Sequence, residues 1–105
     1  MSNNIKNDQW VYILVHGPEG DEHMLGQRDE EFDVSFVPVF LKKDEALMNL
    51  NLLAREKGSK YDVQAILYED LVDRIAGQGF MIFVLDGSGA VIEKINPQSK
   101  SGAVH

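Results

Sequence analysis

Residues 61–85, YDVQAILYEDLVDRIAGQGFMIFVL, decide the fold, because they predict a strand, a short helix and a second strand in direct succession. Apolar residues in 61–67 alternate with Asp62 and Gln64, the period of two that is typical of a strand with one wet face. The next residues carry an apolar stripe at helical spacing and end in glycine. The run FMIFVL at 80–85 predicts a buried strand, so the whole stretch indicates a crossover connection within a mixed sheet.

Two further strands are predicted on the N-terminal side of this unit. Residues 10–15, WVYILV, form a continuous apolar run rich in β-branched and aromatic side chains. Residues 32–41 begin with alternating apolar and polar side chains, and Pro38 within them indicates an edge position or a bulge. We expect these two strands to form a hairpin with a long acidic connection.

A second helix and a second hairpin complete the pattern. Asp44 is a suitable N-cap or first-turn acid for a helix that runs to about Lys57 and is ended by Gly58. The turn residues DGSG at 86–89 connect the buried strand to AVIEKI at 90–95. The predicted fold is an α+β two-layer fold in the order ββαβαββ, with a mixed sheet of four to five strands and two helices packed on one of its faces.

Length and composition predict one soluble domain. At 105 residues the chain forms a single domain 1–105, with an ordered core at about 9–96 and flexible termini at 1–8 and 97–105. The absence of cysteine excludes disulfides and thiolate chemistry. There is no secretory signal and no apolar run of about 20 residues, so we expect a cytoplasmic protein without a membrane partner.

The negative charge is concentrated in one segment. Residues 19–33 contain seven carboxylates and one basic residue, Arg28, and so hold six of the seven net negative charges. A nucleic-acid-binding protein would show the opposite sign on one face, so this class of partner is excluded. An acidic segment of this kind instead favours a basic protein partner.

The candidates for a metal or catalytic site lie within this segment and just before it. His16 and His23 flank a Pro/Gly turn and have carboxylates beside them, but their spacing matches no known metal motif, and lone loop histidines commonly bind nothing. The carboxylates have no apolar surroundings that would separate their pKa values for acid–base catalysis. Neither a G-x-S-x-G elbow nor a phosphate-binding glycine motif is present, and the segment from Asp86 lacks the ligand spacing of a calcium-binding loop. We therefore expect no cofactor and favour a non-enzymatic protein, with a metal-dependent binder or enzyme that uses His16 and His23 as the alternative.

The helix at 44–57 gives one further candidate surface. Its core stripe is predicted to comprise Ala46, Leu47, Leu50, Leu53 and Ala54. Met48 and Leu52 lie on the opposite side of the helix, four residues apart. Such a pair can pack under a loop, remain exposed without a role, or contact a partner or a second copy of the chain.

The chain resembles two families of small bacterial proteins. The segment VPVFLKKDEALMNLN at 37–51, the strand GFMIFVL and the later Asn96-Pro97 resemble the N-terminal domain of SseB-like proteins over about residues 36–97. The opening VYILVHGPEG at 11–20 is similar to the DUF3110 family. Both resemblances imply a small α/β domain, and neither implies catalytic residues.

These observations together predict a small binding or regulatory module that contacts proteins through an acidic loop and an apolar helix face. A homodimer is one form that such a module can take. The predicted partner-binding residues are Asp21, Glu22, Asp29, Glu30, Glu31, Asp33, Met48 and Leu52.

Overall fold

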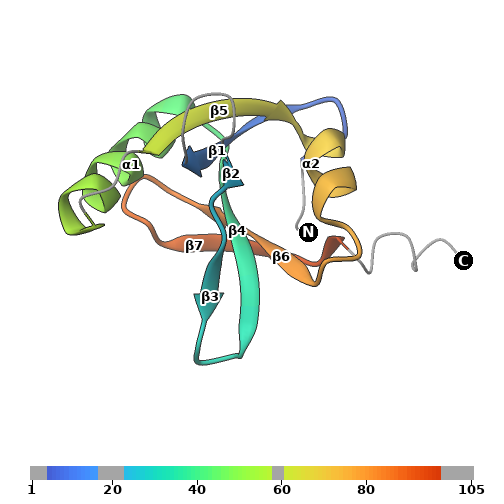
Figure 1. The fold of residues 1–105 in the computed structure, drawn as a ribbon. Coiled ribbons are helices and arrows are strands. Elements are labelled where there is room, and N and C mark those ends of the chain that lie inside the picture. Colours follow the sequence, from blue (N-terminus) through green and yellow to red (C-terminus); the bar gives the residue numbers. More distant parts are fainter. Residues whose placement is uncertain (1–4, 17–22, 58–60, 98–105) are drawn as a thin grey trace, which may run out of the picture.

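The computed structural model describes residues 5–16, 23–57 and 61–97 and contains a single mixed sheet and two helices (Figure 1). The elements in chain order are β1 (Trp10–His16), β2 (His23–Met24), β3 (Gln27–Asp29), β4 (Val34–Phe40), α1 (Lys43–Lys57), β5 (Tyr61–Leu67), α2 (Tyr68–Ile75), β6 (Phe80–Leu85) and β7 (Val91–Ile95). The predicted α+β class is confirmed, and so are the five strands and two helices expected from the sequence.

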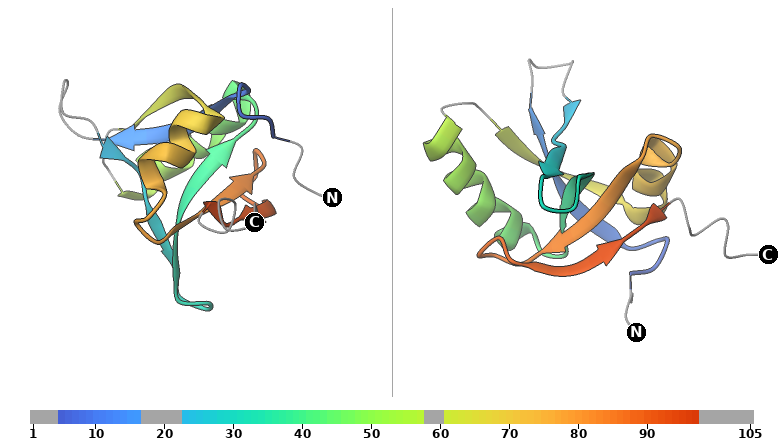
Figure 2. Two further views of the ribbon diagram at one scale, coloured as in Figure 1. Left: turned by 90° about the vertical axis from the view of Figure 1, so that its right-hand side faces the viewer. Right: turned by 90° about the horizontal axis from the view of Figure 1, so that it is seen from below.

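Strand β1 is an interior strand, and β4 lies in the middle of the five long strands, in the order β5-β1-β4-β6-β7. The whole length of β1 pairs antiparallel with β5, and its other edge is shared between β2 and β4. Strand β4 runs parallel to β6, so the sheet is mixed, as predicted, and β6 forms a hairpin with β7. The sheet bends strongly along this path, and β5 and β7 lie far apart in Figures 1 and 2.

The acidic connection between β1 and β4 is more regular than the predicted loop. It contains two short strands, β2 paired with β1 and β3 paired with β4. The segment from His23 to Asp29 therefore passes from one long strand to the other, with Gly26 between the two pairings. The predicted hairpin of the two long strands is present as well, because Tyr12 and Ile13 of β1 pair with the end of β4.

Two hydrophobic clusters form the core, one on each face of the central strands. Val11, Ile13 and Val15 of β1 join the cluster that contains Leu71 of α2. The alternate residues of β1 face the other cluster, which contains Ala46 of α1. The expectation that both helices lie on one face is therefore wrong. A strand covered on both faces is apolar at every position, which is the pattern of WVYILV.

The helices differ in how much of their surface they bury. Four residues of α2 are buried, and they include most of the predicted stripe: Tyr68, Leu71, Val72 and Ile75. In α1 Ala46 is buried, but Leu47 is 40% exposed, so its place in the predicted core stripe is wrong. Neither helix within the described residues is both long and apolar enough to cross a membrane.

Pro38 is buried in an interior strand, in contrast to the predicted edge position. It pairs with Phe83 of β6 on one side of β4. On the other side, β3 pairs with residues up to Phe36, and β1 pairs from Val39 onward. Pro38 therefore occupies the gap between these two neighbours, where its missing N–H costs no ladder hydrogen bond.

Candidate functional site

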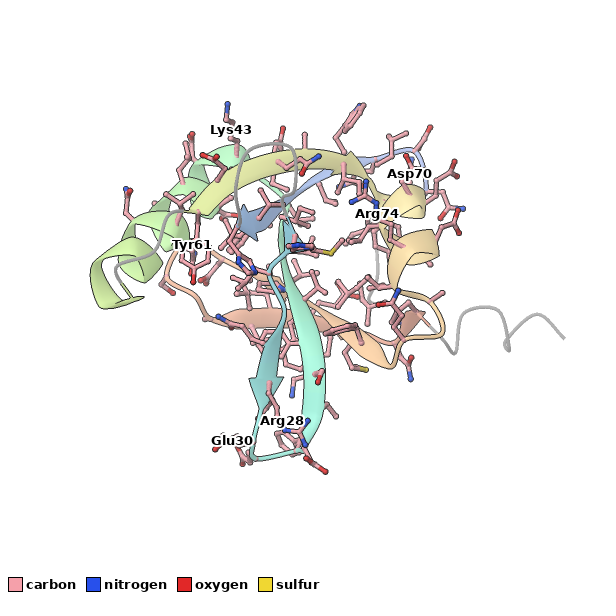
Figure 3. The ribbon with its side chains drawn as sticks, in the orientation of Figure 1. Arg28, Glu30, Lys43, Tyr61, Asp70 and Arg74 are labelled. Carbon is pink, nitrogen blue, oxygen red and sulfur yellow. The ribbon has the colours of Figure 1, made fainter. Side chains whose placement is uncertain are left out.

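The β3–β4 hairpin projects from the body of the protein and carries an acidic turn at its tip (Figures 1 and 3). The Asp29 carboxylate accepts a hydrogen bond of 3.0 Å from the Glu31 amide, which fixes the start of the turn. Arg28 pairs with Asp33 across the turn. Asp33 has a φ of 57°, in the left-handed region that Asp tolerates better than most residues. The tip therefore has a defined backbone shape.

Phe32 lies within this acidic turn and is 59% exposed. The Lys94 ammonium group of β7 lies 4.5 Å from the centroid of the Phe32 ring and 5.0 Å from that of Phe83. Phe83 in turn stacks on Phe36, with 4.1 Å between the ring centroids. Cation–π and stacking contacts thus connect the exposed aromatic residue of the tip to the core of the sheet.

The structure gathers four of the predicted partner-binding residues at this tip. Glu30, Glu31 and Asp33 are exposed, and Asp29 is half-buried at the end of β3. Asp21, Glu22 and the side chain of Leu52 lie outside the described residues. Phe32 and Lys94 were not singled out from the sequence, since no local pattern signals a contact between residues so far apart along the chain.

Met48 lies on α1, a helix that is separate from the β3–β4 hairpin in Figure 1. Its side chain is 54% exposed. The Met48 sulfur lies 3.0 Å from the place that a Cβ on Gly87 would occupy, so the side chain covers part of the β6–β7 turn. The structure therefore separates Met48 from the acidic residues and gives it a packing contact in addition to its exposed surface.

The two histidines come together where β1 ends and β2 begins. His16 and His23 are direct cross-strand partners, and their ring centroids are 6.3 Å apart. The ring of Tyr61 at the start of β5 lies 5.8 Å from that of His16, edge on. No group of three or more His, Asp or Glu side chains among the described residues is placed to hold a metal ion. Two imidazoles alone would leave a bound metal dependent on water for its other ligands.

The predicted DGSG turn contains Asp86, a carboxylate whose pKa is lowered. This carboxylate accepts hydrogen bonds from the Ser88 hydroxyl at 2.8 Å, the Ser88 amide at 2.9 Å and the Ala90 amide at 3.0 Å. These bonds lower the pKa of Asp86 because they favour the charged form, and the bond from the Ser88 hydroxyl has the largest effect. All three donors belong to the turn itself, so Asp86 has a structural role.

The roles of these surfaces are assigned from their own geometry. No family model, curated protein or solved structure matches this chain.

Proposed function

We propose that this chain is a small non-enzymatic binding module that contacts a basic segment of a protein partner through the tip of the β3–β4 hairpin. The observation that carries the proposal is the exposed Phe32 in the middle of an acidic turn on a projecting hairpin. An aromatic side chain supplies contact area at low cost in conformational entropy, and carboxylates around it select the charge of the partner.

The charge of the tip supports steering of such a partner. Residues 28–33 carry four carboxylates and one guanidinium, a net charge of −3. At physiological salt an exposed charge acts over about 8 Å, so closely spaced carboxylates on a projecting hairpin act together on an approaching cation. A partner that also reached α1 would add contact with Met48.

A random peptide display library tests the charge requirement. We expect the wild-type chain to enrich peptides that combine Lys or Arg with an apolar residue, and their binding to weaken steeply as salt rises. The variant D29N/E30Q/E31Q should lose these peptides. The control E69Q/D70N/D73N removes three carboxylates from α2 and should retain them. Equal losses in the two variants, or salt-independent binding, would contradict the proposal.

The aromatic requirement is tested separately, without any change of charge. Phe32→Ala should weaken binding of the enriched peptides at least tenfold, which corresponds to about 1.4 kcal/mol. Trp10→Ala is the matched control, since Trp10 is 57% exposed at the start of β1, outside the hairpin. Binding that depends on Trp10 and not on Phe32 would move the contact surface away from the tip.

The cross-strand histidine pair favours a second candidate, a metal-dependent binder. Two imidazoles with ring centroids 6.3 Å apart could share one metal ion. Thermal melts with and without zinc, manganese and calcium test this function. Stabilisation by one metal in the wild type, absent from the variant H16A/H23A, would support it, and melts unaffected by all three metals would reject it.

A further inference from the structure

A pocket of about 360 Å³ opens between the end of α2, the turn between β2 and β3, and the start of β6. Its floor is apolar and includes the buried side chains of Val37 and Ile75 and the half-buried ring of Phe80. Its rim is polar and comprises His23, Arg74 and Gln78, all exposed. A volume in this range and an apolar floor with a few polar groups at one side are typical of small-molecule sites.

The pocket has the opposite charge to the rest of the chain. Among the described residues that line it, Arg74 carries a fixed charge and none is Asp or Glu, although the chain carries a net charge of −7. Among the described residues the Arg74 guanidinium forms no ion pair or hydrogen bond. Asp70 lies one helical turn earlier on α2, but Figure 3 shows Arg74 on the side of the helix that faces β2. The guanidinium is therefore available to an anion in the pocket.

The carbonyl groups at the end of α2 would repel an anion if they were free, but three of them accept hydrogen bonds. The Val72 carbonyl accepts a hydrogen bond from the Ala76 amide at 2.8 Å. The Ile75 carbonyl accepts from the Gln78 amide at 3.1 Å, and the Arg74 carbonyl accepts from the Gln78 side chain at 2.7 Å. These bonds reduce the negative potential that a helix C-terminus normally presents.

We infer that this pocket binds a small organic carboxylate. The Arg74 guanidinium pairs with the carboxylate in the two-pronged geometry that Arg favours, and the apolar part of the ligand lies on Val37, Ile75 and Phe80. A monoanion fits better than a phosphate group, because the described lining supplies one fixed positive charge beside the apolar side chains of Val37, Ile75 and Phe80. This site is independent of the hairpin tip and does not rest on the proposed function.

Benzoate and benzamide are the probes, because they have nearly the same shape and differ in charge. Backbone amide signals in an NMR titration with benzoate should shift at Gly26 and Gln78, which line the pocket. Benzamide should bind at least tenfold more weakly, and inorganic phosphate should produce no saturable shift there. Equal binding of benzoate and benzamide, or tighter binding of phosphate, would overturn the inference.

Two substitutions of Arg74 make the test specific. Arg74→Gln should weaken benzoate binding at least tenfold, and Arg74→Lys should have an intermediate effect because it retains the charge without the fork geometry. Arg74 is exposed, so both variants should fold, which their NMR spectra will establish. Arg28→Gln removes the same charge from the hairpin tip and should leave benzoate binding unchanged. A loss of similar size in Arg28→Gln would show a general charge effect and reject the site.

Discussion

Asn49 connects α1 to the β6–β7 turn through hydrogen bonds. Its side-chain amide donates hydrogen bonds to the Asp86 carbonyl at 3.1 Å and to the Gly87 carbonyl at 3.3 Å. It also donates to the Glu45 carbonyl of its own helix at 3.1 Å. These hydrogen bonds are partly buried, so water cannot fully replace Asn49 as the donor to the three carbonyl groups.

The effect of a substitution at Asn49 on the free energy of unfolding should therefore depend on whether the new side chain can donate hydrogen bonds. Asn49→Ala should lower the free energy of unfolding by about 1–2 kcal/mol, because carbonyl groups lose a partner. Asn49→Asp should cost more, since its carboxylate oxygens would face the same carbonyl oxygens. Urea unfolding of both variants measures the difference. A chain that tolerates Asp as well as Ala would show that these hydrogen bonds contribute little.

The lowered pKa of Asp86 predicts a specific pH dependence. The carboxyl binds its proton less readily in the folded chain than in the unfolded chain, where its pKa is near 3.8. Its contribution to stability is therefore present above that pKa and is lost as the pH falls through the lower, folded value. Asp86→Asn should remove this part of the acid sensitivity, measured as stability against pH below about pH 5. Asp62→Asn, a change at an exposed acid of β5 outside the turn, should leave it in place.

At the scale of elements, strong local patterns were sufficient for prediction. β5, α2 and β6 follow from period-two and helical spacing in 61–85, and the DGSG turn indicates the β6–β7 hairpin. β2 and β3 were not predicted, because two or three residues are too short to show a period. Their pairing is instead imposed by the long strands beside them.

The candidate site could be predicted only in part, for a related reason. Local sequence indicates an acidic, exposed segment, and the tip residues Glu30 and Glu31 have that character. Phe32 contacts Lys94, and the pocket beside Arg74 forms, only where elements far apart in the sequence come together in the folded chain. Local sequence patterns contain no information about such long-range contacts.

The packing of α2 gives a prediction for one element. Leu71 is 0% exposed and sits within the cluster between α2 and the sheet. Leu71→Ala should lower the free energy of unfolding by about 2–5 kcal/mol, because it leaves a cavity there. Asp73→Ala on the exposed side of the same helix should change it by less than about 0.5 kcal/mol. Similar losses in both variants would contradict the observed orientation of α2.

At the scale of the whole molecule, the sheet separates the core into two clusters with no buried residue in common. Leu71 belongs to one cluster and Phe40 to the other. Because neither side chain is a packing partner of the other, the effects of Leu71→Ala and Phe40→Leu should add within about 0.5 kcal/mol. Urea unfolding of both single variants and the double variant measures the coupling. A larger coupling would mean that the two faces respond as one unit.

The pairing of β1 with β5 also governs when the chain can fold during synthesis. Along one edge, β1 pairs with residues 61–67, and the parallel partner of β4 is β6. Both partners lie in the C-terminal half of the chain. Pairings between residues so far apart form late, because a long loop must close first. A fragment that ends at Lys57 should therefore show no cooperative unfolding by circular dichroism. On the ribosome, β1 and β4 would therefore complete their pairings only after residues 61–85 have been synthesised.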